Sequence, residues 1–269
     1  RGALSKLTSL TEEEKAKGIM AVSSGNHGAA VSYASGLLGI KNTTIFVPEI
    51  TPKSKINKIE YYGAKVKIVG KDYDETHEIA MNYLKENDVT YVDPCSDREV
   101  IAGQGTMAFE IFDQNPDIDT ILVPIGGGGM ITGIGVAAKN IKPSINVIGL
   151  QTEACPAMIQ SLKDNKFYDV FPIEETICDA LVGGVGEIPY NMAKECIDDI
   201  WEVKEEMIAK AVPFMINKEK VIAEPSGTIG VAAILQDPSL IKGKNVAIVI
   251  SGGNIDEELM FKLLSEARN

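Results

Sequence analysis

The sequence contains little of what several common classes of site require. It has only two histidines and four cysteines among 269 residues, and the cysteines show no CxxC spacing. Since these side chains are the usual ligands of zinc, we expect neither a zinc cluster nor any other metal site. Scattered thiols without a signal peptide predict a reducing, cytoplasmic location. The four thiols are those of Cys95, Cys155, Cys178 and Cys196.

Basic residues are also scarce relative to acidic ones. The chain has 26 Lys and Arg against 38 Asp and Glu, so its formal net charge is −12. Nucleic acids and anionic membrane surfaces are bound by basic faces, so we expect neither as a partner. No apolar run approaches the roughly 20 residues that span a bilayer. With 45% hydrophobic residues, the chain is expected to be a soluble globular protein.

Three familiar catalytic signatures are missing or misplaced. No Walker A sequence is present, so ATP hydrolysis is not indicated. No G-x-S-x-G elbow surrounds Ser24, which disfavours a hydrolase built on Ser24 and His27. Residues 133–138 match G-x-G-x-x-A, with Glu153 twenty residues after the first glycine. That match lies inside an expected helix and not at a strand-to-helix turn, so dinucleotide binding is disfavoured as well.

The most informative segment is ILVPIGGGGMITGIG, residues 121–135. Its apolar first part predicts a buried strand, and its last part predicts a helix. The four glycines between them, Gly126–Gly129, let the backbone adopt positive φ and approach a ligand closely. The first N–H groups of the helix lack internal partners and form the positive end of its dipole. We therefore predict a phosphate cradle here and not a flexible connection, in which four glycines would cost needless entropy.

Apolar patterning predicts strands that alternate with helices along the chain. Strands are expected at residues 19–22, 43–47, 66–69, 90–92, 121–125, 147–150, 200–203 and 246–250. Helices are expected near residues 1–10, 29–38, 53–62, 73–87, 101–112, 130–139, 157–162, 190–196, 205–216, 226–235 and 256–267, with an irregular region at 172–188. This alternation predicts an α/β protein with mostly parallel sheets.

Three polar or glycine-rich loops follow expected strands, at residues 23–28, 126–129 and 251–254. Ligands of such folds lie at the carboxyl ends of the strands, so the three loops can converge on one site. The first loop, SSGNHG, offers hydroxyl, amide, imidazole and backbone N–H groups at a helix start, which suits a carboxylate. That is more than a helix N-cap needs. The third loop brings the hydroxyl of Ser251 beside two glycines, although a plain cap explains it almost as well.

Several motifs occur together in a known order: RGAL, SSGNHG, VIAGQGT, VPIGGGGM and VISGGN. In this the chain resembles the fold-type II pyridoxal-phosphate enzymes, and most closely the threonine/serine dehydratases and serine racemases. The resemblance covers essentially the whole chain. It implies two interwoven three-layer α/β domains with mostly parallel sheets, as in the tryptophan-synthase-beta-like fold. We expect a small domain at residues 18–94 and a large cofactor-binding domain at 1–17 plus 95–269.

The resemblance also implies roles for particular residues. The glycine loop and the residue after it hold the phosphate of pyridoxal 5'-phosphate, Asn26 bonds the ring 3-hydroxyl, and Ser251 contacts the pyridine nitrogen. Ser24 matches the catalytic serine that exchanges a proton in the racemases. The implied cofactor-binding residues are Asn26, Gly126, Gly127, Gly128, Gly129, Met130 and Ser251. The implied substrate-binding residues are Ser23, Ser24, Gly25, Asn26 and His27.

Two departures from the family pattern concern the catalytic lysine and a metal site. The family's Schiff-base lysine lies two residues before the arginine of RGA, which here is Arg1. Lys6 and Lys15 do not match it, so we expect the lysine, with an N-terminal part of the large domain, upstream of Arg1. Gln151 and Ala157 stand where animal-type racemases have acidic metal ligands, which again implies no metal site.

The activity implied by the resemblance is α,β-elimination of L-threonine or L-serine to a 2-oxo acid and ammonia. A serine or threonine racemase of the same family is the alternative, because Ser24 is present. A non-catalytic paralogue that binds an amino acid is the alternative from another class. The implied partners are a free amino acid and further copies of the chain, in a homodimer or homotetramer.

Overall fold

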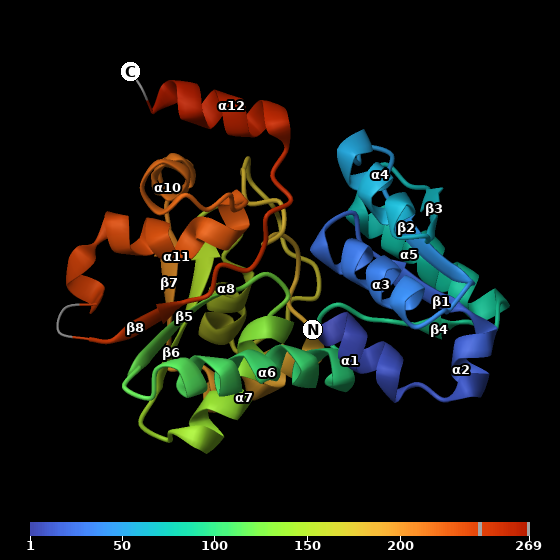
Figure 1. Ribbon diagram of the computed structural model, residues 1–269, viewed down its shortest axis with the longest axis horizontal. Coiled ribbons are helices and arrows are strands. Elements are labelled where there is room, and N and C mark those ends of the chain that lie inside the picture. The colour runs from blue at the N-terminus through green and yellow to red at the C-terminus, as the bar shows by residue number, and fades with distance from the viewer. Residues whose placement is uncertain (242–243, 268–269) are drawn as a thin grey trace. The chain divides into compact units, whose positions relative to one another are not determined.

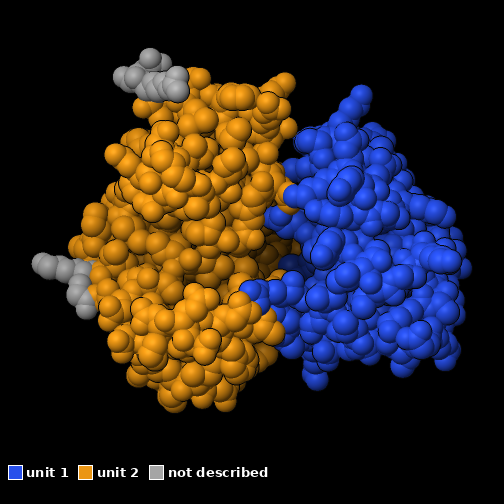
Figure 2. Space-filling view, viewed as in Figure 1, with its two compact units in different colours: residues 1–103 blue, residues 104–269 orange. Residues whose placement is uncertain are grey.

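The computed structural model describes residues 1–241 and 244–267. The chain divides into two compact units, Arg1–Gly103 and Gln104–Asn269 (Figures 1 and 2). Each unit contains one four-stranded sheet, and all the strand pairs in both sheets are parallel. The predicted α/β class with parallel sheets is confirmed. The small domain expected at residues 18–94 lies within the first unit, and its exact limits stay a prediction.

The first unit is built on a sheet with strand order β3-β2-β1-β4. Its strands are β1 (Ile19–Val22), β2 (Thr43–Val47), β3 (Lys65–Ile68) and β4 (Thr90–Tyr91). Its helices are α1 (Gly2–Ser9), α2 (Glu12–Lys17), α3 (Asn26–Leu37), α4 (Lys53–Tyr61) and α5 (Tyr73–Glu86), followed by α6 (Arg98–Gln114), which ends in the second unit.

Strand β1 is buried on both faces, which explains its continuous apolar sequence. Ile19 and Ala21 join the core shared with α1, α3 and α4, whereas Met20 and Val22 join a smaller core with Phe46 and α5. The alternation follows from the two-residue period of a strand. The central strand is thereby packed on both faces, which fixes the point at which the loop leaves its carboxyl end.

The second unit repeats this plan with strand order β7-β6-β5-β8. Its strands are β5 (Thr120–Pro124), β6 (Asn146–Thr152), β7 (Asp199–Val203) and β8 (Val246–Ile248). Its helices are α7 (Gly129–Ile141), α8 (Ala157–Asp164), α9 (Glu187–Cys196), α10 (Glu205–Phe214), η1 (Met215–Glu219), α11 (Pro225–Gln236), η2 (Pro238–Ile241) and α12 (Glu257–Glu266). Ile121 and Val123 of β5 face one core, with α7, α8 and α9, and Leu122 faces the other, with α10 and α11.

Several predicted boundaries are wrong by a few residues. Helix α3 begins at Asn26 and not at residue 29, so the second half of SSGNHG forms its first turn. Strand β8 ends at Ile248 and not at residue 250, because the chain turns there to pack Gly252 against Gly227 in α11. Helix α10 continues as a π-helix to Glu219. All eight predicted strands are present.

Candidate active site

The loop after β1 is shaped by its own backbone. The Ser23 N–H donates to the Phe46 carbonyl at 3.1 Å, which extends the β1–β2 pairing by one residue. The Ser23 hydroxyl accepts the Gly25 N–H at 3.2 Å. A Cβ on Gly28 would lie only 2.2 Å from the Ser23 carbonyl oxygen, so the first turn of α3 folds directly onto the loop. Only glycine permits that approach.

The start of α3 is suited to an anion. Its N-cap is Gly25, no side chain in the described part of the protein caps it, and its first turn has no acidic residue. The N–H groups there and the positive end of the helix dipole are therefore directed at whatever lies before the helix. Ser24 and Asn26 are half-buried at the same place. This arrangement supports a carboxylate site, which stays a prediction for Ser23, Ser24, Gly25, Asn26 and His27.

The imidazole of His27 has a structural contact. Its Nε2 lies 3.0 Å from the carbonyl oxygen of Val92, just after β4. Burial lowers the pKa of His27, and this outweighs the hydrogen bond to Val92, which acts in the opposite direction. The ring is thus neutral at pH 7 and donates Nε2–H to Val92, which joins the loop after β1 to the end of β4. His27 therefore shapes the loop through its ring.

The glycine loop after β5 has the close packing that a phosphate cradle needs. Gly128 has φ +91°, and a Cβ on it would lie 2.7 Å from Cβ of Pro189 and 3.1 Å from Cε of Met158. The Gly127 carbonyl accepts the Gly186 N–H at 2.9 Å, which fixes the turn from its other side. A side chain at position 128 would fill the space and strain the backbone, so the sequence requires glycine there.

Helix α7 begins at Gly129 without a cap from any side chain that the structure describes. The first internal bond runs from the Thr132 N–H to the Gly128 carbonyl at 3.1 Å, so the N–H groups before Thr132 have no partner within the helix. Gly126, Gly127 and Met130 are partly exposed, whereas Gly128 and Gly129 are buried. A phosphate dianion matches this set of donors and the helix dipole.

The loop after β8 lies at the same edge of the sheet as the glycine loop. Leu122 of β5 pairs with Ile248 of β8, and the Val249 N–H donates to the Leu122 carbonyl at 3.0 Å. Strands β5 and β8 both end within a few residues of that pair. The segment after β5 leads to Gly126, and the segment after β8 leads to Ser251. Ser251 is exposed at this edge.

A buried carboxylate that the sequence analysis missed shapes this third loop. Glu224 is only 3% exposed. Its N–H donates to the Gly252 carbonyl at 3.0 Å, and its Oε2 accepts the Asn254 N–H at 2.8 Å. A Cβ on Gly227 would lie 2.8 Å from the Gly252 oxygen. The motif EPSG, residues 224–227, was the available signal, since a charged residue before an apolar helix is rarely buried without a role.

The structure thus brings together two of the three predicted loops within the second unit. The loop at residues 23–28 belongs to the first unit, so its convergence with the others stays a prediction. Gln151 caps α8, because its Oε1 accepts the N–H groups of Met158 and Ile159, both at 3.0 Å. No group of three His, Cys, Asp or Glu side chains able to hold a metal occurs among residues 1–241 and 244–267.

Gly133 and Gly135, which resembled part of a dinucleotide fingerprint, lie inside α7. A Cβ on Gly135 would lie 2.4 Å from the Cys196 carbonyl oxygen, so this glycine lets α7 pack against α9. The helix packing explains the glycine without a nucleotide.

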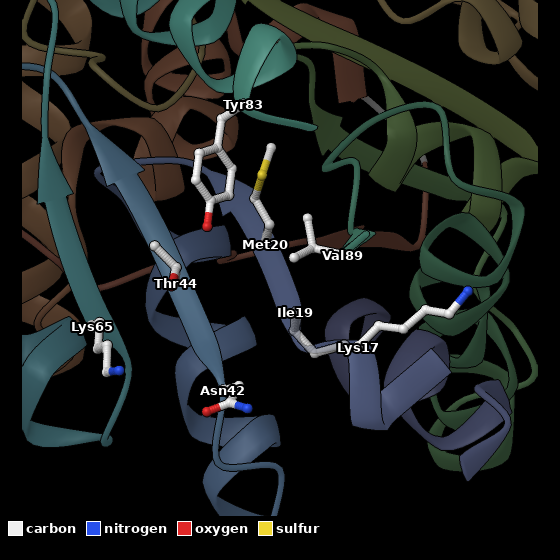
Figure 3. Close-up of a pocket in the computed structure, with 8 residues that line it drawn as sticks. All are labelled: Lys17, Ile19, Met20, Asn42, Thr44, Lys65, Tyr83 and Val89. Carbon is white, nitrogen blue, oxygen red and sulfur yellow. The ribbon is translucent and has the colours of Figure 1, made fainter. Parts of the chain in front are cut away.

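A cavity of about 250 Å³ lies in the first unit (Figure 3). It is lined by Lys17, Ile19, Met20, Asn42, Thr44, Lys65, Tyr83 and Val89. Ile19, Thr44 and Lys65 lie at the amino ends of β1, β2 and β3, opposite the loop at residues 23–28, and Tyr83 comes from α5. Lys17 points away from the other lining residues, and its Nζ is 3.2 Å from Asp88. None of the predicted site residues lines this cavity.

A parallel α/β fold with an uncapped helix behind a glycine loop defines the chain as a protein that binds a phosphorylated ligand. The model of one family, described as pyridoxal-phosphate dependent enzyme, matches residues 1–252. The chain belongs to this family, and the predicted membership and cofactor are confirmed. Pyridoxal phosphate carries one phosphate, which fits the donor set at the start of α7.

Named relatives and solved structures support the same assignment. The chain is 41% identical over 267 residues to the L-threonine ammonia-lyase of Thermotoga maritima. The match includes 99% of this chain and 66% of that protein. The processed threonine deaminase isoform 2 of Solanum lycopersicum is 31% identical with a TM-score of 0.92, over 99% of this chain and 78% of that chain. Maize serine racemase is 31% identical with a TM-score of 0.88, over 100% of this chain and 84% of that chain.

The environment of His27 predicts a pH dependence. Because its pKa is lowered in the folded state, His27 favours folding above its unfolded pKa, about 6.5, and this contribution is lost as the pH falls below that value. We expect the His27 ring, observed by NMR in a His77→Gln variant, to titrate below pH 6.5. A His27→Asn variant should lose less stability between pH 7 and 5 than the wild type. A ring of His27 that titrates at or above 6.5 would contradict the burial argument.

Proposed function

We propose that the protein is an L-threonine/L-serine dehydratase, which converts its substrate to a 2-oxo acid and ammonia. The main observation in support of the cofactor site is that α7 begins directly after Gly128 without a cap from a described side chain. The reaction is supported by the relative named L-threonine ammonia-lyase, and the chain spans 66% of that protein's length. The solved threonine deaminase adds likeness over 99% of this chain.

When bound, pyridoxal phosphate supplies an electron sink that makes the α-hydrogen of an amino acid acidic. The residues of the chain bind and orient the cofactor and the substrate. The N–H groups of Gly129 and Met130 would donate to the phosphate. The Ser251 hydroxyl would contact the pyridine nitrogen, and Asn26 would hydrogen-bond the ring hydroxyl. The hydroxyl of Ser251 stays neutral at physiological pH, so it can bond the ring nitrogen without forcing a proton onto it.

In this proposal the substrate carboxylate lies at the start of α3. The N–H groups in the first turn of α3 and the hydroxyls of Ser23 and Ser24 are the proposed donors, and the Gly25 N–H is used within the loop by its bond to Ser23. His27 keeps these donors in place through its bond to Val92, and because its ring is neutral it adds no charge of its own. The helix dipole favours the carboxylate over a neutral group.

The proposal includes the setting of the reaction. The substrate is a free amino acid, and the protein works in the cytoplasm as a homodimer or homotetramer. The three buried thiols, at Cys155, Cys178 and Cys196, form no disulfide and suit a reducing compartment.

We expect the full-length protein, loaded with pyridoxal phosphate, to release 2-oxobutanoate and ammonia in equal amounts from L-threonine, or pyruvate and ammonia from L-serine. Oxo acid and ammonia are measured separately, and bound cofactor is measured by its visible absorbance. A protein that binds the cofactor but releases no oxo acid from either amino acid would be the non-catalytic paralogue. One that binds no cofactor would overturn the proposed site.

The cradle is tested by Gly128→Ala. The added Cβ meets Pro189 at 2.7 Å and the backbone has φ +91°, so we expect affinity for pyridoxal phosphate to fall by about tenfold or more. The matched control is Gly63→Ala, where φ is +99° but no atom lies within 4 Å of the added Cβ. That control carries the strain, about 1 kcal/mol, without blocking the cradle. Equal cofactor affinities in the two variants would count against the phosphate site.

Racemisation of serine or threonine is the second candidate, favoured by the likeness to maize serine racemase and by Ser24. If Ser24 delivers a proton to the face opposite the lysine, Ser24→Ala should abolish racemisation while elimination from the L-isomer is retained. Chiral chromatography of the amino acid and an oxo-acid assay separate the two activities. Loss of both activities in parallel would place Ser24 in substrate binding and not in proton transfer.

A further inference from the structure

One wall of the glycine cradle is formed by an irregular segment of the second unit, residues 176–186. A Cβ on Gly126 would lie 3.0 Å from the Ala180 carbonyl oxygen and 3.2 Å from Cα of Leu181, so this backbone lies in contact with the loop. The Gly186 N–H donates to the Gly127 carbonyl at 2.9 Å. The shape of the cradle therefore depends on where this segment is held.

The segment is held at its beginning by the carboxylate of Glu205, the first residue of α10. Glu205 Oε1 accepts the Thr176 hydroxyl at 2.7 Å, and its Oε2 accepts the Ile177 N–H at 3.0 Å. The Thr152 hydroxyl, at the end of β6, donates to the same Oε1. One carboxylate thus joins the irregular segment to the carboxyl end of the sheet through three donors, and hydrogen bonds to an ionised acceptor are the strong ones.

Glu205 is itself fixed by the sheet. Its N–H donates to Oε1 of Glu153 at 2.9 Å, and Glu153 directly follows β6. Farther along the segment, the Ala180 N–H donates to the Ser226 hydroxyl at 3.2 Å, and the Leu181 N–H closes a turn onto the Cys178 carbonyl at 2.9 Å. The stretch that touches Gly126 is therefore anchored by Glu205 before it and, at Ala180 itself, by Ser226 of α11.

We propose that Glu205 is a positioning residue for the cofactor: its carboxylate holds residues 176–181 against the glycine loop and so maintains the geometry of the phosphate cradle. This rests on the proposed function, because it takes the glycine loop to be the phosphate site. Glu205 touches neither cofactor nor substrate in this role. It acts through the backbone of Ala180 and Leu181, which lie in contact with Gly126.

The test compares Glu205→Ala with Glu206→Ala in the full-length protein. Glu206 is the next residue in the first turn of α10, but its carboxylate is exposed and pairs only with Lys210 among the described residues. Both variants remove one acidic side chain from the start of the same helix. We expect Glu205→Ala to lower the affinity of the apoprotein for pyridoxal phosphate by about tenfold or more, and Glu206→Ala to leave it unchanged.

Two further measurements separate positioning from a general loss of stability. Pyridoxal lacks the phosphate, so its affinity should change far less in Glu205→Ala than that of pyridoxal phosphate. Hydrogen exchange should speed up at the amides of Ile177, Ala180 and Gly186, and not in β5 or β6. Glu205→Gln keeps one acceptor oxygen, so it should restore part of the cofactor affinity.

The outcomes distinguish this proposal from the proposed function. A wild-type protein that binds no pyridoxal phosphate would overturn the cofactor site itself. If the wild type binds it and Glu205→Ala binds it as tightly as Glu206→Ala does, Glu205 has no positioning role. Equal losses for pyridoxal and pyridoxal phosphate, or faster exchange throughout the second unit, would reduce Glu205 to a stabilising residue and overturn the proposal.

Discussion

The second unit is organised around the unsatisfied N–H groups at the start of α7. A helix that begins directly behind a buried strand exposes several backbone donors and the positive end of its dipole. No side chain that the structure describes caps them, and the glycine at 128 keeps the approach open, with φ +91°. A phosphate matches the donors of such a helix start, and we propose that the cofactor phosphate binds there. The start of α3 in the first unit likewise has no cap from a described side chain, and we propose that it binds a carboxylate.

Two carboxylates bond the irregular segments that lie near the start of α7 and after β8. The Glu224 carboxylate accepts the Asn254 N–H, and the Glu205 carboxylate accepts the Thr176 hydroxyl and the Ile177 N–H. Each acts on a segment without regular secondary structure, where the backbone cannot satisfy its own donors. A carboxylate with two oxygens can accept several N–H and O–H groups at once, so one side chain replaces the missing ladder of a strand or helix. These loops have no regular secondary structure, but the hydrogen bonds to the two carboxylates fix their positions.

Much of the fold could be predicted because its signals are local. Strand β1, with apolar residues at every position, and the strand and glycine loop around Gly126 could be recognised from pattern alone. Two boundary errors coincide with close backbone contacts of glycines. Helix α3 starts early because Gly28 packs on the Ser23 carbonyl, and β8 ends early because Gly252 meets Gly227. The second contact joins segments far apart in the chain, so the residues beside Gly252 do not show it.

By itself the sequence determined the α/β class, the family and the identity of the loops, since strand–loop–helix periodicity and ordered motifs are carried by residues close together in the chain. The tertiary structure alone decided which side chains support those loops. Glu205 and Thr176 are far apart in sequence, and nothing in either segment shows that they bond. The same holds for His27 and Val92, joined because β1 and β4 are neighbours in the sheet. Contacts of this kind depend on strand order, which is a property of the whole fold.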